Sequence, residues 1–521
     1  MRPLLIFTIF LLLQLSSVHA QHIRYSPPET GIKTFASYEI IGKVGGHMLI
    51  YISGEDHAEI GVFDDDMKKL GAVPADFLKK NSSQSDFFTY PDHFFLTFQY
   101  HTGSTYYCAM IKSDENGKVL EGPVILDSTV LMPVAYKGPD LPMFIVLRSE
   151  NTQWFMTIKG VPSDNDDQKL EATLYDKDFE PLKRTRFTYS NLKVPGEFSE
   201  FILDNDGDLA FIHSLKSDEK VSRVLLATLF FKPHDQDTLI MTALSTPGAQ
   251  LDDLKIQIDN ANHRYLFNSL YYKTSSPDLT GLCTMIWDKR SMGLTSKTLA
   301  PLSPQISADA RSDFSPPEQV LNYYFLRQVF PYADGGFMVL AELCHGFERS
   351  NSPDFVRTDY IAGKIAYLRS PENLPIRYEP KVKPGYWLYS SRNINTLDGM
   401  SSWGRTTERI LAFIMDPDGK IRDAKVVPMK GNTGTWLYMV SYQPFILGKA
   451  IHIMYNERVK ARYVPVEIPI LGDGTMGTET ILHNLNSEYV FFPRYGKQVG
   501  PNTAIIPCQA GDLLCFARVD F

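Results

Sequence analysis

The stretch Glu408 to Met429, ERILAFIMDPDGKIRDAKVVPM, contains two apolar runs separated by Asp416-Pro417-Asp418-Gly419. The runs are rich in β-branched residues and the four residues between them are turn formers, so the stretch predicts a β-hairpin. The same order of apolar run, turn cluster and apolar run recurs along most of the chain of 521 residues. A recurring supersecondary unit of this kind is typical of a β-propeller.

The spacing of the turn clusters indicates the size and number of the repeated units. Successive outer turns begin at Asp64, Asp114, Asp176, His234, Asp288, Asp416 and Gly472. Five of the six intervals measure 50 to 62 residues, which suits one four-stranded unit, and the remaining interval measures 128 residues. We therefore predict an all-β fold, a β-propeller of eight four-stranded blades, with seven blades as the alternative count. Two stacked β-sandwiches would share the alternation but would not need the repeated four-strand period.

The long interval contains a segment of different composition. Residues 345–405 are rich in Ser, Pro, Gly and Asn, and they show few paired apolar runs with a turn between them. We interpret this segment as an insertion within the sixth blade, and a ninth unit is the alternative. Residues 21–521 are accordingly expected to form a single propeller domain.

The first twenty residues have the order of a secretory signal peptide. Met1-Arg2 precedes an apolar run from Leu4 to Leu13, and Val18-His19-Ala20 supplies small residues for cleavage near Ala20. The apolar run is shorter than the ~20 residues that a membrane helix needs. We expect a secreted or periplasmic protein without a transmembrane anchor.

Charge and cysteine content narrow the classes of partner and cofactor. The formal net charge of -8 at pH 7 argues against nucleic acid as a partner, and we expect a monomer. Five cysteines without a CxxC motif indicate neither a disulfide framework nor a zinc site. Cys508 and Cys515 alone could pair, if the residues between them form a short hairpin loop; otherwise both are small apolar strand residues.

One acidic turn has the alternating carboxylates of a calcium loop. Asp204, Asp206 and Asp208 could together wrap a single hard cation. The EF-hand spacing is incomplete, because Leu215 stands where that loop has an acidic residue. Ordinary turn chemistry explains the same residues without a metal. No cofactor other than this possible calcium ion is expected.

Motifs of familiar enzymes are missing from the sequence. The chain contains no Gly-x-Ser-x-Gly, no His-Glu-x-x-His and no phosphate-binding glycine loop. Glu342 is the one acid embedded in a strongly apolar strand, and a buried carboxyl group is a candidate for acid/base catalysis. The alternative is a carboxylate at a strand end that is paired or solvated.

The predicted insertion holds the residues most suited to binding a ligand. Aromatic faces with arginine donors stack on sugar rings and on partner peptides, although aromatic residues in a long loop also hold that loop to the body of a domain. The candidate ligand-binding residues are Tyr386, Trp387, Tyr389, Arg392, Trp403 and Arg405.

Part of this pattern resembles a known group of proteins. Asp334 to Glu342 reads as Asp-Gly-Gly followed by an apolar strand, and after the interruption come a strand, Asp416 to Gly419 and a strand that ends at Pro428. This order is similar to that of signal-peptide-bearing bacterial proteins with propeller-like repeats. The resemblance implies the fold and the compartment, and it brings no activity with it.

Together these features suggest two functions. The first is a secreted or periplasmic propeller that binds a glycan or an envelope protein without catalysis. The second is a carbohydrate-active hydrolase or lyase with acidic residues in the axial cleft.

The chain ends suggest how the ring closes. The last unit, from Ser487 to Phe521, supplies three strands where the others supply four. An uncovered edge strand promotes aggregation, so proteins usually cover it. We expect an N-terminal segment to pair with the last blade as its outer strand, and we favour Ile32 to Phe35 over His22 to Tyr25.

Overall fold

The computed structural model describes most of the chain. The described residues are 22–29, 37–53, 58–78, 83–130, 144–161, 168–189, 196–215, 226–232, 240–244, 246, 248–251, 254–273, 279–311, 324–345, 405–429, 433–434, 442–459, 462–482, 485–486, 488–511 and 513–521.

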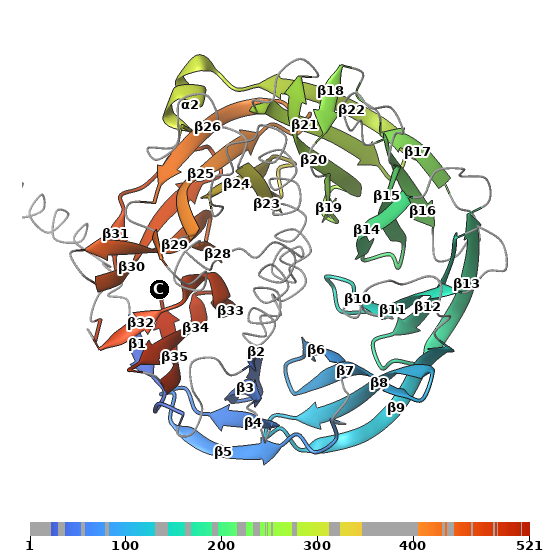
Figure 1. Cartoon of the computed structure of the whole chain (residues 1–521), viewed down its shortest axis with the longest axis vertical. Helices are drawn as coiled ribbons and strands as arrows, with labels where there is room; N and C mark the ends of the chain where they lie inside the picture. Colours follow the sequence, from blue (N-terminus) through green and yellow to red (C-terminus); the bar gives the residue numbers. More distant parts are fainter. Residues whose placement is uncertain are drawn as a thin grey trace, which may run out of the picture.

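In these residues the strands form eight antiparallel sheets, arranged around a central axis as a β-propeller (Figure 1). Sheet one contains β2 (Ser37–Val44), β3 (His47–Ser53), β4 (Ala58–Phe63) and β5 (Lys69–Pro74), and sheet two contains β6 (Ser83–Thr89), β7 (His93–Thr102), β8 (Thr105–Asp114) and β9 (Val119–Val130). Sheet three contains β10 (Phe144–Arg148), β11 (Trp154–Val161), β12 (Gln168–Asp176) and β13 (Pro181–Tyr189). Sheet four contains β14 (Gly196–Leu203), β15 (Leu209–Leu215), β16 (Leu226–Lys232) and β17 (Ile240–Leu244).

Sheets five to eight complete the ring. Sheet five contains β18 (Ala249–Leu251), β19 (Lys255–Asp259), β20 (Arg264–Lys273), β21 (Leu279–Asp288) and β22 (Gly293–Pro301), and both β18 and β19 pair with β20. Sheet six contains β23 (Tyr324–Pro331), β24 (Phe337–His345), β25 (Arg405–Met415), β26 (Ile421–Pro428) and the short β27 (Thr433–Gly434), and sheet seven contains β28 (Tyr442–Leu447), β29 (Ala450–Val459), β30 (Arg462–Leu471) and β31 (Thr480–Ile481). Sheet eight contains β32 (Tyr489–Phe491), β33 (Lys497–Gly500), β34 (Thr503–Ala510), β35 (Leu513–Asp520) and β1 (His22–Tyr25). The described helices are α2 (Pro304–Asp309) and the 3-10 turn η3 (Pro493–Tyr495).

The core lies between neighbouring sheets rather than at one centre. Met338 and Leu340 of β24, for example, pack with Tyr442, Ile453 and Ile468 of sheet seven. Middle strands are covered on both faces, so β20 is buried at every residue except its last, Lys273. Strands buried on both sides need near-continuous apolar runs, and these runs are the pattern that the sequence displays.

The outer turns of sheets one to three share one hydrogen-bond pattern. The Oδ1 atom of Asp64 accepts hydrogen bonds from the amides two and four residues later, and Asp114 and Asp176 repeat both contacts. The fourth residue of each turn has a positive φ, which glycine adopts readily, yet Met67 and Phe179 occupy it in sheets one and three. Both side chains are buried in the core, so apolar contacts compensate for the backbone strain.

The structure confirms the propeller, and its described residues form eight sheets. Residues 435–441 lie outside the described part of the chain. Residues 346–404, nearly all of the expected insertion, also lie outside it, so the insertion stays a prediction.

The ends of the chain close the ring as expected, but a different segment makes the contact. Strand β1 pairs antiparallel with β35, from His22 opposite Asp520 to Tyr25 opposite Ala517, and forms the outer strand of sheet eight (Figure 1). We favoured Ile32 to Phe35 for this role, and that segment lies outside the described residues. The four residues nearer the N-terminus provide the outer strand instead.

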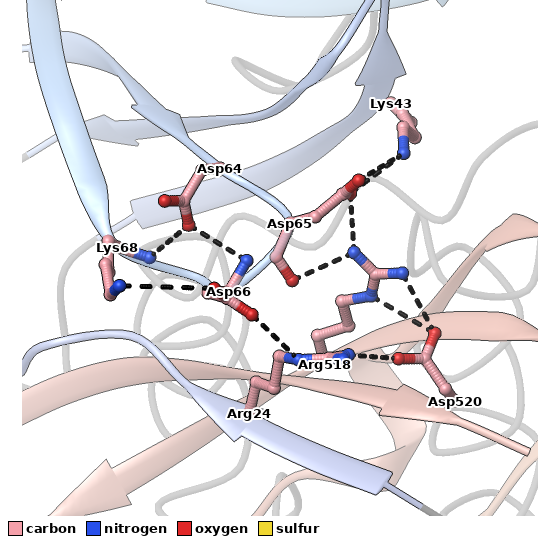
Figure 2. Close-up of polar contacts among 8 residues, drawn as sticks. All are labelled: Arg24, Lys43, Asp64, Asp65, Asp66, Lys68, Arg518 and Asp520. Carbon is pink, nitrogen blue, oxygen red and sulfur yellow. Dashed lines mark hydrogen bonds and ion pairs between the residues drawn. The ribbon is translucent and has the colours of Figure 1, made fainter.

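Ion pairs join the closed sheet eight to sheet one (Figure 2). Arg24 of β1 contacts Asp520 of β35 at 2.5 Å and Asp66 of the outer turn of sheet one at 3.1 Å. Arg518 of β35 lies 2.5 Å from Asp65 and 3.1 Å from Asp520. The two ends of the chain therefore hold the same turn of the first sheet.

Removing the N-terminal strand should destabilise the whole propeller. A chain that begins at residue 30 lacks β1 and exposes the edge of β35, so we expect a fall in Tm and a rise in aggregation. The control is a chain that begins at Gln21. Equal melting temperatures, measured by circular dichroism, would contradict the closure.

The ion pairs at the closure should make stability depend on acid pH. The hydrogen bond from Lys43 and the charge of Arg518 lower the pKa of Asp65. Burial opposes ionisation of Asp520, but Thr503, Arg518 and Arg24 outweigh it and lower the pKa of that carboxyl. A lowered folded-state pKa stabilises the protein above the unfolded pKa, about 3.9, and this contribution disappears as pH falls further.

We therefore expect Tm to fall more steeply below about pH 4 in the wild type than in the variant D65N/D520N. Thermal melts between about pH 3 and pH 6 would measure this. D418N is the matched control, because Asp418 is an exposed turn carboxylate elsewhere in the ring. Parallel pH profiles for the wild type and the D65N/D520N variant would contradict the prediction.

Candidate functional site

The two ends of the ring carry different candidate sites. Neighbouring strands of each antiparallel sheet run in opposite directions. The first and third strands of a sheet therefore begin at the same end of the ring, and the second strand finishes there. We call this end the start face. In sheet six, β24 finishes there at His345 and β25 begins there at Arg405. Both ends of the connection that spans residues 346–404 therefore lie at the start face.

Most of the candidate ligand-binding residues belong to that connection. Tyr386, Trp387, Tyr389, Arg392 and Trp403 lie outside the described residues. Arg405 opens β25, where its backbone pairs with Gly434. The structure therefore brings none of these side chains to a described site, and their role in binding stays a prediction.

Glu342, the candidate catalytic acid, is fully buried between sheets six and seven. It lies on the same face of β24 as Met338 and Leu340, which pack against sheet seven. One of its carboxylate oxygens lies 3.6 Å from Nε of Arg327 on β23. The guanidinium group of Arg327 in turn lies 5.8 Å from the ring centre of Tyr442, the first residue of β28.

A β-bulge provides the position of Arg327. The register of β23 and β24 shifts between Leu326 and Gln328, so Arg327 is the extra residue. Such a bulge redirects a side chain without ending the strand. Arg494 of η3 is also buried, and its charge acts on the Tyr442 phenol together with those of Arg327 and Glu342. We call Arg327, Glu342, Tyr442 and Arg494 the start-face cluster.

The electrostatics of this cluster keep Tyr442 protonated. Burial raises the pKa of the phenol far above its usual value, and the guanidinium groups of Arg327 and Arg494 only partly oppose that rise. A neutral phenol donates a hydrogen bond but does not act as a base at neutral pH. The cluster is therefore better suited to holding neighbouring strands or a ligand in place than to abstracting a proton.

The candidate calcium loop forms a hydrogen-bonded turn at the opposite end of the ring. Oδ1 of Asp204 accepts the amides of Asp206 and Asp208, both at 2.9 Å, in the pattern of the outer turns. The hydroxyl of Tyr265 donates to Oδ2 of Asp204 at 2.6 Å. One oxygen from each of the three carboxylates lies within 4.8 Å of the others.

The ammonium group of Lys289 lies among these three carboxylates. It contacts Asp204, Asp206 at 2.6 Å and Asp208 at 2.8 Å. Burial opposes its charge, but the carboxylates outweigh burial and raise the pKa of Lys289. The amine is therefore a permanent cation that links sheet five to sheet four. A calcium ion would have to displace it, and the calcium site stays a prediction.

Sequence reasoning singled out the acids of both clusters but missed the bases. Arg327 interrupts the apolar run of β23 much as Glu342 interrupts that of β24, and this signal was readable. Lys289 stands in a polar turn and Arg494 stands between a proline and a tyrosine, and neither setting identifies the partner of a basic residue. Only the placement of neighbouring sheets shows that Lys289 contacts Asp204 and that the charge of Arg494 acts on Tyr442.

Comparisons with known proteins identify no relative by sequence. No family model matches the chain, and no curated protein matches it either. The solved structures that resemble it include the WD40 domain of SCAP from fission yeast, with 8% identity, a TM-score of 0.41 and coverage of 96% of this chain and 98% of that one.

Several enzymes also appear among the similar structures, and two of them illustrate the range. One is an ulvan lyase of polysaccharide lyase family PL25, at 8% identity and a TM-score of 0.38, over 82% of this chain and 90% of that one. The other is oligopeptidase B from Trypanosoma brucei, at 9% identity and a TM-score of 0.37, over 93% of this chain and 54% of that one. These similarities transfer no activity, substrate or partner.

No helix in the described part of the chain is long and apolar enough to cross a membrane.

Replacing Lys289 should reveal the competition between the lysine and a metal. In K289M the three carboxylates lose their shared cation, so we expect a loss of stability on the order of 3 kcal/mol, as for other buried ion pairs that lose one partner. Added Ca²⁺ should restore part of the Tm of K289M and leave the wild-type Tm unchanged.

Thermal melts with calcium and with a chelator would measure both effects. The control is K420M, because Lys420 forms an exposed ion pair with Asp418. A wild-type Tm that rises with calcium and falls with the chelator would show a native metal site and contradict our expectation.

Proposed function

We propose that this chain is an exported β-propeller that binds a glycan of the cell envelope, without converting it, through the connection between β24 and β25. Export rests on the signal-peptide pattern of the first twenty residues. The choice of site rests on the architecture of sheet six.

The observation that carries the proposal is the continuity of sheet six on either side of this connection. Strands β24 and β25 pair from Phe337 opposite Met415 to His345 opposite Thr406, the residues nearest the connection. The described strands already complete eight sheets and close the ring. The connection is therefore not needed as a blade, and a long connection that the scaffold does not need is typically functional.

The composition of the connection favours a glycan as ligand. It contains Trp387 and Trp403, two of the five tryptophans in the chain, together with tyrosines and Arg392. Aromatic rings present flat apolar faces that match sugar rings, and arginine donates hydrogen bonds to hydroxyl or carboxylate groups. A protein ligand would use the same residue types, and the experiment below separates the two.

The start-face cluster would supply a rigid base for this binding segment. Glu342 stands three residues before the end of β24, and its backbone is opposite Ile410 of β25. Its contact with Arg327 and the contact of Arg327 with Tyr442 bridge sheets six and seven below the connection. A binding site that is anchored on rigid elements of a scaffold is positioned more precisely than one on an unsupported loop.

The same cluster favours binding over the carbohydrate-active hydrolase or lyase. A general acid has to lie within hydrogen-bond reach of its substrate, and Glu342 is completely buried and directed at Arg327. The protonated phenol of Tyr442 is a poor base for a lyase. The enzyme remains the second candidate, and turnover assays decide between the two.

Excision of the connection tests the proposal. Replacing residues 352–404 by a short Gly/Ser bridge keeps Arg405, the first residue of β25. Loop length adds closure entropy only slowly, so we expect an intact β-sheet spectrum and a nearly unchanged Tm. Binding to an array of neutral and acidic polysaccharides and peptidoglycan fragments should disappear.

Point variants make the same test without a deletion. We expect W387A and W403A each to weaken binding roughly tenfold, the usual effect of removing an aromatic anchor. W154F is the control, because Trp154 lies at the other end of the ring and donates to Asn205. If the chain captures an envelope protein and gives no glycan signal, the ligand is a protein and not a glycan. If sugar products are released, the chain is an enzyme.

A further inference from the structure

The last hairpin of the chain brings two cysteines face to face. Strand β34 ends at Ala510 and β35 begins at Leu513, so the hairpin loop is short, as a pairing of the two cysteines requires. Gly511 has φ +59, a left-handed conformation that suits such a loop. In this register Cys508 lies directly opposite Cys515.

The two side chains point toward each other in the core. Their sulfur atoms are 3.0 Å apart, closer than non-bonded sulfurs usually approach, and both side chains are fully buried. Directly opposite residues of an antiparallel pair have Cα atoms about 4.5 to 5.5 Å apart, within the range that a disulfide spans. Backbone and side chains are therefore arranged for a bond without rearrangement of the hairpin.

We propose that Cys508 and Cys515 form a disulfide bond in the exported protein, which fixes the closing sheet of the ring. The proposal uses only the export part of the proposed function and is independent of any ligand. The other two cysteines whose side chains are described, Cys108 and Cys283, lie in strands of sheets two and five.

The oxidation is an exchange with a disulfide of a thiol oxidoreductase or of glutathione. The thiolate of one cysteine attacks the disulfide of the oxidant and forms a mixed disulfide, and one thiolate of the oxidant leaves. The second cysteine then attacks the cysteine sulfur of the mixed disulfide and releases the second oxidant thiolate. The chain loses two electrons and two protons, and the oxidant disulfide becomes two thiols.

Burial determines when this exchange takes place. In the folded protein, burial raises the pKa of the Cys508 thiol well above its usual value, and the Cys515 thiol donates to the Cys508 carbonyl at 3.2 Å. The reactive thiolate is therefore scarce once the sheet has closed. The bond forms while the hairpin is still accessible, and the folded protein then shields it from reductants.

The location links the disulfide to the ring closure. Tyr25 of β1 stacks on Tyr489 with ring centres 4.3 Å apart, and both pack against the apolar cluster that contains the two cysteines. A bond between β34 and β35 holds the strand on which β1 docks. It thereby restricts opening of the sheet that joins the two ends of the chain.

Peptide mass gives a direct test, because both cysteines fall in one tryptic peptide, residues 498–518. The full chain is exported to the periplasm of a bacterial host, purified without reductant, unfolded with an alkylating reagent present and digested. We expect this peptide without alkyl groups and two hydrogen masses below its dithiol mass, whereas the peptides of Cys108 and Cys283 are alkylated. Alkylation of both Cys508 and Cys515 would overturn the proposal.

Stability gives a second readout. We expect the wild-type Tm to fall by several degrees after unfolding and refolding with a phosphine reductant, while reductant applied to the folded protein has little effect. C508A/C515A should melt near the reduced wild type and show no response to reductant. C283A is the control, because it retains the hairpin pair. If the double variant fails to fold, the peptide mass of the wild type still tests the disulfide. Glycan binding is measured separately on the reduced protein, so a failure of the disulfide proposal can be told apart from a failure of the proposed function.

Discussion

The pairing of β1 with β35 is the contact on which the ring depends. In the other seven sheets, most neighbouring strands follow one another directly in the chain, so most of their hydrogen bonds join residues that are close in sequence. Sheet eight takes its outer strand from the opposite end of the chain, with His22 opposite Asp520. This contact has the largest sequence separation in the fold and a correspondingly high cost in loop entropy. Arg24 and Arg518 reinforce it through carboxylates that belong partly to sheet one.

Between the sheets, stability comes from contacts of each sheet with its two neighbours. Apolar residues of adjacent sheets form separate clusters, such as that of Met338, Ile453 and Ile468. Polar links at the turns supplement them, as where Lys289 of sheet five meets the Asp204 turn of sheet four. In a repeat architecture of this kind, the free energy of unfolding is close to a sum of contributions from each repeat and from the contacts between neighbouring repeats. An interruption between two strands of one sheet is tolerated when the strands on either side still pair, as β24 and β25 do.

Buried charged side chains occur at both ends of the ring, and their roles differ. At the start face, Arg327, Glu342 and Tyr442 bridge sheets six and seven beside the connection that we propose as the ligand site. At the opposite end, the amine of Lys289 lies among three carboxylates that could otherwise attract a metal. In both places a basic side chain pairs with the acid that looked reactive in the sequence: Arg327 with Glu342, and Lys289 with Asp204. Each base also contacts the neighbouring sheet, so the charges serve to join sheets. This explains why acidic residues alone were weak predictors of chemistry in this chain.

The sequence by itself determined the repeated hairpins and their turns, and it narrowed the number of sheets to eight or seven, because these features depend on local turn chemistry and on apolar runs. The turn at Asp416 to Gly419 and the Asp-rich turns of sheets one to three are local in this sense. The need for an added strand in the last sheet was also readable. Tertiary structure alone decided that His22 to Tyr25 fills that place, that Lys289 meets Asp204, and that Arg494 acts on Tyr442. Each of these contacts joins residues from different sheets or opposite chain ends, and short apolar or basic segments carry no information about partners so far away in sequence.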